Sequence, residues 1–183
     1  MKRYIALTIV VSLISLVAFG ATPTADFNVG TWVAEDSGII VHDVQQQPVN
    51  SASSWSSLRA VGTSTDPVWL VLDNEGGEHG ASRNLSVSVK TNQAGTYTLR
   101  ATAGAMTSTE NSAKVGFSVK VGQVTTNVLK SDTAKLINFT TVSVTSGMTY
   151  KTQNFSVTIN ETDYASAIAG QYTSTWTIEL ATT

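Results

Sequence analysis

Residues 171–182 read QYTSTWTIELAT, and polar and apolar side chains alternate along almost the whole stretch. Side chains of a β-strand point to opposite faces with a period of two. One face would carry mostly threonine, and the other would carry Tyr172, Trp176, Ile178 and Leu180. The pattern predicts a strand over these residues, with one face toward a core and the other toward water.

The same alternation recurs through the chain, and no segment predicts a helix of three turns. The apolar phase reverses after Phe139, which predicts a β-bulge near Thr140 and Thr141. Residues 35–38 read as a turn and residues 45–58 as a loop. The sequence therefore predicts an all-β fold, an Ig-like antiparallel β-sandwich of nine or ten strands over residues 39–183.

Two short segments are near copies of each other: AGTYT at residues 94–98 and AGQYT at residues 169–173. Glycine reaches backbone conformations that other residues avoid, and a tyrosine hydroxyl can cap a neighbouring loop while its ring is buried. Two interpretations are open. The copies are either a shared local solution for a sandwich corner or the trace of two duplicated halves.

Residues 1–20 have the features of a signal peptide. Lys2 and Arg3 precede an apolar run over residues 5–17, and AFG at residues 18–20 offers a cleavage site. An uncleaved anchor is the alternative, but the run is short for a span of about 20 residues. We expect a secreted protein, extracellular or at the cell surface, with no stable membrane span after cleavage.

Composition narrows the function classes. The chain has no cysteine, its charged residues make up 13%, and its net charge is −2. An exported protein of this kind relies on packing and hydrogen bonds without disulfides. The charge gives no field that would gather phosphate groups, so we expect no nucleic acid partner.

The residues that carry most catalytic chemistry are scarce. His42 and Asp43 are neighbours in a strand-like context, so their side chains point to opposite faces and cannot pair. No sequence context supports a nucleophile, and two histidines without cysteine leave little for zinc. We expect no enzyme activity, no catalytic residues and no required cofactor.

Two weaker kinds of site remain. Calcium binds six to eight oxygens, so the acidic loop over residues 73–79 is a candidate calcium site, with a solvated turn as the alternative. Its ligands would be Asp73, Asn74, Glu75 and Glu78. Candidate N-glycosylation triplets, used only if the host glycosylates exported proteins, begin at Asn84, Asn138, Asn154 and Asn160.

The N-terminal segment, residues 21–38, contains an alternating stretch over residues 25–33. This stretch is either the first strand of its own sandwich or a donor strand that completes a neighbouring copy. A donated strand binds through main-chain hydrogen bonds, and alternate side chains enter pockets. The side chains that would plug a neighbour's groove are Phe27, Val29 and Val33.

Residues 25–44, together with the ending at residues 169–180, resemble the spore coat protein U group, which is similar to chaperone–usher pilins. The chain lacks the cysteine that the first core strand of that group normally carries. The resemblance implies a structural subunit of a pilus-like or thread-like filament, a homopolymer built head to tail by strand donation. The alternative is a monomeric glycan- or wall-binding module, with Trp32, Trp55 and residues 73–80 as its contact face and Trp69 and Trp176 in the core.

Overall fold

The computed structural model describes residues 35–44, 49–62, 68 and 82–183. This part of the chain is β-rich and antiparallel, as the alternation predicts, with eleven strands where nine or ten were expected and two helices of five residues each. No helix in these ranges is long and apolar enough to cross a membrane. The strands are β1 (Ser37–Asp43), β2 (Ser82–Thr91), β3 (Gly95–Ala103), β4 (Met106–Ser108), β5 (Lys114–Val115), β6 (Phe117–Val121), β7 (Val124–Val128), β8 (Lys135–Val144), β9 (Thr149–Ile159), β10 (Tyr172–Thr173) and β11 (Trp176–Thr182), and the helices are α2 (Ala52–Ser56) and α3 (Glu161–Ala165).

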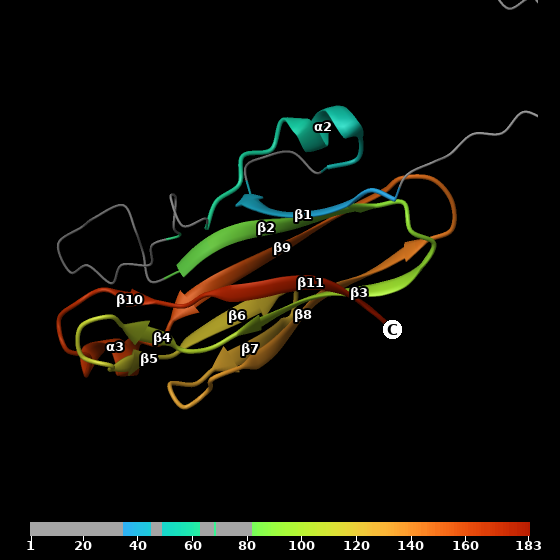
Figure 1. Cartoon of the computed structure of the whole chain (residues 1–183). Coiled ribbons are helices and arrows are strands. Elements are labelled where there is room, and N and C mark those ends of the chain that lie inside the picture. Colours follow the sequence, from blue (N-terminus) through green and yellow to red (C-terminus); the bar gives the residue numbers. More distant parts are fainter. Residues whose placement is uncertain (1–34, 45–48, 63–67, 69–81) are drawn as a thin grey trace, which may run out of the picture. The chain divides into compact units, whose positions relative to one another are not determined.

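Two sheets enclose the core. The larger has the order β1-β2-β9-β6-β7 and the smaller has the order β11-β3-β8 (Figure 1). A third, small sheet with the order β10-β4-β5 lies at one end. Every strand pair is antiparallel. The order places β1 and β7 at the edges of the larger sheet, and β11 and β8 at the edges of the smaller one.

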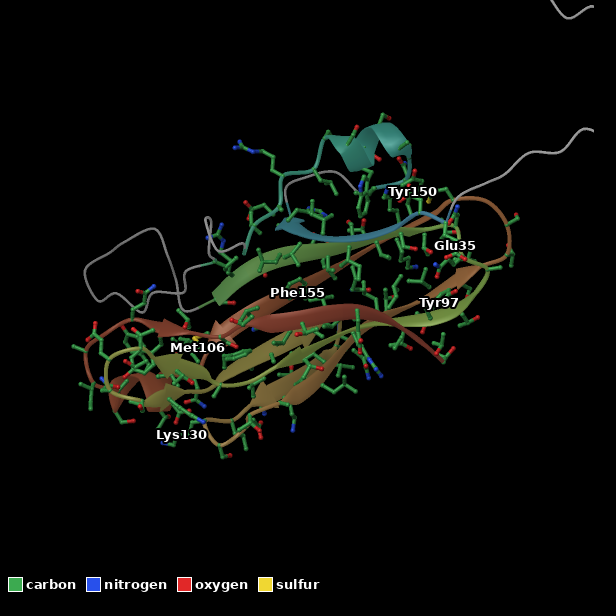
Figure 2. All side chains as sticks on the ribbon, in the orientation of Figure 1. Glu35, Tyr97, Met106, Lys130, Tyr150 and Phe155 are labelled. Atoms are coloured by element: carbon green, nitrogen blue, oxygen red, sulfur yellow. The ribbon has the colours of Figure 1, made fainter. Side chains whose placement is uncertain are left out.

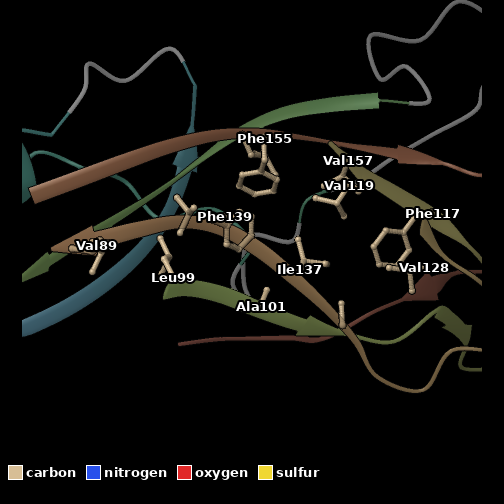
Figure 3. Close-up of a cluster of buried hydrophobic side chains, with 14 of the residues drawn as sticks. Val89, Leu99, Ala101, Phe117, Val119, Val128, Ile137, Phe139, Phe155 and Val157 are labelled. Atoms are coloured by element: carbon tan, nitrogen blue, oxygen red, sulfur yellow. The ribbon is translucent and has the colours of Figure 1, made fainter. Parts of the chain in front are cut away.

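The core forms from the inward side chains of both sheets (Figure 3). Phe139 and Phe155 meet across it with ring centroids 5.0 Å apart. Trp176 stacks on Phe117 with centroids 5.5 Å apart and an interplanar angle of 11°. The prediction that Trp176 belongs to the core is confirmed, and Trp69 lies outside the described residues.

The reversed apolar phase in β8 has the predicted cause. Leu99 of β3 pairs with Thr140, but the next residue, Arg100, pairs with Asn138. Phe139 is therefore the extra residue of a β-bulge, one position before the expected one. The bulge lets both halves of β8 direct their apolar side chains into the core.

The strand predicted over residues 171–182 is split in two. β10 and β11 belong to different sheets. Ser174 lies between them and its hydroxyl donates a hydrogen bond to the backbone carbonyl of Gly104, at 2.7 Å. The prediction of one continuous strand is wrong at this point, because a side-chain hydrogen bond to a distant segment replaces the local ladder.

The loop expected over residues 45–58 contains α2. Ser51 caps this helix: its hydroxyl accepts the Ser54 N–H at 3.2 Å, while the Ser54 hydroxyl accepts the Ser51 N–H at 3.0 Å. This reciprocal arrangement is a capping box built from two serines. Figure 1 shows α2 beside β1, on the side away from the smaller sheet.

The two AG-x-Y segments form similar turns. Gly95 and Gly170 have φ values of 144° and 153°, which favour glycine. The Tyr97 hydroxyl donates to the carbonyl three residues earlier, Ala94, at 3.2 Å, and the Tyr172 hydroxyl donates to the carbonyl four residues earlier, Ile168, at 2.8 Å. Both interpretations of the near copies, a shared local solution and two duplicated halves, stay open.

Candidate functional site: the cleft between β1 and β11

Residues of the edge strands β1 and β11, of β3 and of the loop between β2 and β3 line an open cleft of about 430 Å³. In the described part of the chain, β1 pairs with β2 and β11 pairs with β3, and neither has a strand on its other side. The residues that line the cleft are Ser37, Gly38, Ile39, Gln93, Tyr97 and Leu180. Figure 2 shows Tyr97 near Glu35, at the end of the sandwich where β1 begins.

The inward side chains of these edge strands are covered less well than their neighbours in the interior strands. Ile39 lies opposite Val89, and Leu180 lies opposite Leu99. Val89 and Leu99 are fully buried, whereas Ile39 and Leu180 are only half-buried against the same core. Their alternation directs them inward, but no described strand covers them from the side.

The chain closes one end of the free edge of β1. The Val61 N–H donates to the Val41 carbonyl at 2.9 Å, and Val61 and Val68 pack against the core. The cleft therefore opens at the other end of β1, around Ser37 and Ile39.

A chain of hydrogen bonds on the outer face of the larger sheet holds β1 to β2 and β9. His42 is fully buried. Its Nδ1 lies 2.9 Å from the backbone carbonyl of Asp43, which can only accept, so Nδ1 carries the proton. Nε2 of the ring shares a hydrogen bond with the Ser88 hydroxyl at 2.8 Å. The Thr152 hydroxyl shares a hydrogen bond with the Ser88 hydroxyl at 2.7 Å and accepts the Val49 N–H at 3.2 Å.

We name this set the His42 relay: Asp43 carbonyl, His42, Ser88, Thr152 and Val49 N–H. It joins β1, β2, β9 and the segment that leads into α2. His42 and the Asp43 side chain do not pair, as predicted; Asp43 instead forms an ion pair with Arg83 at 3.3 Å. The relay lies at the end of β1 opposite to the residues that line the cleft.

The sequence predicts that Trp55 is free to face solvent or a partner, but in the structure its side chain is half-buried. The Lys90 ammonium lies 5.5 Å from the centre of its ring. A Cβ on Gly38 would meet the Trp55 ring at 2.9 Å, so the ring lies close against β1. The second residue proposed for that contact face, Trp32, lies outside the described residues, as do residues 73–80.

Of the remaining predicted site residues, some lie outside the described residues and others lie within them. The donor-strand plugs Phe27, Val29 and Val33 lie outside the described residues, and so do the candidate calcium ligands at residues 73–78. All four candidate glycosylation asparagines are exposed on strands or strand ends, and two of them already make hydrogen bonds. The Oδ1 of Asn154 accepts the Ser86 hydroxyl at 2.8 Å, and the Oδ1 of Asn160 caps α3 by accepting the Asp163 N–H at 3.0 Å.

The cleft is suited to an extended peptide. It offers apolar walls for side chains and two strand edges for main-chain hydrogen bonds, which is the basis of strand addition. Tyr97 is the one residue with a titratable side chain among those that line it. Comparison with family models, with curated proteins and with solved structures gives no match.

Proposed function

We propose that this protein is a secreted structural subunit of an extracellular or cell-surface filament, assembled head to tail by strand donation. Residues 25–33 of one copy fill the cleft between β1 and β11 of the next. The observation that carries the proposal is that β1 and β11 each have a strand on one side only in the described part of the chain, and that their inward side chains are half-buried. An added strand would cover Ile39 and Leu180 and would satisfy the backbone groups along β11.

The strand order supports this proposal. In an Ig-like sandwich one sheet has the order A-B-E-D and the other contains C, F and G, with G beside F. If β1, β2, β9 and β6 correspond to A, B, E and D, then β3 and β11 correspond to C and F. The position of strand G beside β11 is then open in the described part of the chain, with β4, β5, β7, β8 and β10 as additions.

A stable contact requires both burial of the apolar plugs and main-chain hydrogen bonds. Burying Phe27, Val29 and Val33 stabilises the complex by about 1.5–3 kcal/mol each. Association costs an estimated ~4–15 kcal/mol in lost freedom of motion. The apolar plugs alone do not reliably offset this cost, so main-chain hydrogen bonds to the free edge of β11 must contribute.

Deletion of residues 21–33 tests the proposal. Protein without residues 1–20 should form threads in negative-stain electron micrographs, and the deletion variant should remain folded and elute as a monomer in size-exclusion chromatography. A matched pair of point variants sharpens the result. Val29→Asp changes a plug and should prevent assembly, whereas Asn28→Asp lies on the opposite face of the same stretch and should not. Threads that survive both the deletion and Val29→Asp would exclude strand donation.

A further inference from the structure

The chain carries the same tripeptide, Asn-Ser-Ala, at residues 50–52 and 111–113, and no other asparagine in the sequence is followed by serine. Asparagine can lose its side-chain amide by reaction with its own backbone. The nitrogen of the next residue attacks Cγ, ammonia leaves, and water opens the resulting cyclic imide to aspartate or isoaspartate. The two copies have the same intrinsic chemistry, so a difference in their reactivity must come from the fold.

The copy at residues 111–113 lies in the hairpin loop between β4 and β5. The Ala113 N–H donates to Oδ1 of Asn111 at 3.0 Å. A hydrogen bond from an asparagine side chain to the backbone two residues on is an Asx turn, and the ring that it closes contains both Cγ of Asn111 and the backbone nitrogen of Ser112. The two reacting atoms are therefore held close together, which is the condition for a fast intramolecular attack.

The same hydrogen bond also favours the attack electrostatically. Negative charge develops on Oδ1 as the nitrogen adds to Cγ, and the Ala113 N–H already points at that oxygen. The Ser112 N–H donates to no described residue, so no hydrogen bond within this part of the chain restrains the nitrogen. Ser112 is exposed and Asn111 is only half-buried, so water and hydroxide reach both residues.

The copy at residues 50–52 is held in a less reactive arrangement. The Ser51 N–H donates to Oγ of Ser54 at 3.0 Å, as part of the capping box of α2. This nitrogen must give up its hydrogen bond before it can attack. The Oδ1 of Asn50 accepts the Ser54 hydroxyl at 3.5 Å, a length at which a hydrogen bond is weak.

The six other described asparagines are also less suited to the reaction. Asn92 precedes Gln93, whose N–H donates to Oγ1 of Thr91 at 3.2 Å. The Oδ1 of Asn160 is used to cap α3. The rest lie in β-strands and precede leucine, valine or phenylalanine, whose larger side chains hinder the nitrogen: Asn84, Asn127, Asn138 and Asn154.

We propose that Asn111 is a site of self-modification, at which the backbone nitrogen of Ser112 displaces ammonia and water opens the imide to aspartate or isoaspartate. The bond from this nitrogen to Cγ forms and the bond from Cγ to the amide nitrogen breaks. The proton of the Ser112 nitrogen passes to hydroxide, and the departing nitrogen takes a proton from water. Water is the only co-reactant. The product adds one negative charge to the net charge of −2, beside Glu110, and the inference does not depend on strand donation.

The two copies of the tripeptide make a matched experiment within one chain. Purified protein is kept in mildly alkaline buffer, either folded or unfolded in guanidinium chloride, then digested, and both asparagine peptides are followed by mass spectrometry. In the folded protein Asn111 should react at least about tenfold faster than Asn50, because one preorganised donor is worth about 10²–10³ in an enclosed site and water weakens it in an open turn. In the unfolded chain the two rates should be similar.

Three variants sharpen the result. Ser54→Ala releases the Ser51 N–H and should raise the rate at Asn50 in the folded protein. Ser56→Ala is the matched control, because the Ser56 hydroxyl donates to the Ser53 carbonyl in the same helix and not to Ser51. Since α2 contains no buried residue, both variants should stay folded, which circular dichroism checks. Asn111→Gln should abolish the acidic form that accumulates in ion-exchange chromatography.

Three outcomes would overturn the inference. Equal rates at Asn111 and Asn50 in the folded protein would mean that the sequence alone sets both. A rate at Asn111 that rises on unfolding would mean that the turn protects the amide. An unchanged rate at Asn50 in Ser54→Ala would remove the argument from the unrestrained nitrogen of Ser112.

Discussion

Replacement of Ser88 by alanine should destabilise the protein through the His42 relay. Ser88→Ala removes the hydrogen-bond partner of Nε2 of His42, a ring that is fully buried. A buried polar group left without a partner costs about 1–3 kcal/mol, and the Thr152 hydroxyl loses its hydrogen bond to Ser88 as well. For a chain of this size each kcal/mol lowers Tm by about 2–4 °C. We therefore expect Tm to fall by about 2–12 °C.

Thermal and urea unfolding followed by circular dichroism measure this effect. Ser143→Ala is the matched control, because Ser143 is exposed on β8 and should change the free energy of unfolding by less than about 0.5 kcal/mol. A double-mutant cycle with His42→Ala should give a coupling energy of about 0.5–3 kcal/mol between His42 and Ser88. If Ser88→Ala unfolds like Ser143→Ala, the relay does not hold β1 to the sheet and the reasoning fails.

Three further substitutions test packing and the cleft. A Cβ at Gly116 would lie 2.7 Å from a backbone carbonyl oxygen, so Gly116→Ala should cost about 1–3 kcal/mol in urea unfolding; a variant as stable as the native chain would contradict that close approach. Trp176→Ala should cost about 3 kcal/mol because it removes the stack on a buried phenylalanine, whereas Thr177→Ala on the opposite face should be nearly neutral; equal Tm values for the two would contradict this packing. Leu180→Asp should raise the concentration needed for filament assembly about 10- to 100-fold in sedimentation assays, while Glu179→Asp should leave it unchanged; a shared effect would place the donated strand elsewhere.

The sequence predicted the features that depend on neighbouring residues, namely the β-bulge and the two glycine turns. The reversed phase of apolar residues around Phe139 predicted the bulge. One extra residue in β8 is needed if the apolar side chains on both sides of it are to face the core. The turns at Gly95 and Gly170 could be predicted from glycine and tyrosine. Glycine can adopt the positive φ of these turns, and the tyrosine hydroxyl can donate to a nearby backbone carbonyl.

The features that escaped prediction depend on partners far away in the sequence. Ser174 breaks the last strand because its hydroxyl reaches Gly104, and nothing within residues 171–182 indicates that contact. Asp36 continues β1 because Asn92 offers both a donor and an acceptor, 56 positions along the chain. The helix α2 had a local signal in Ser51 and Ser54, but two serines are a weaker cap signature than the usual Ser-x-x-Glu.

The cleft illustrates the limit of alternation as a guide. Ile178 and Leu180 alternate as regularly as Ala101 and Leu99, their partners in β3, so the sequence assigns all four to the core. Only the strand order separates them, because in the described part of the chain β3 has a neighbour on each side and β11 has one. Burial then differs although the pattern is the same: Leu99 and Ala101 are fully buried, and Ile178 and Leu180 are half-buried. Under the strand-donation proposal this difference has one cause. The residues of β11 are patterned for a core whose last strand belongs to another copy of the chain.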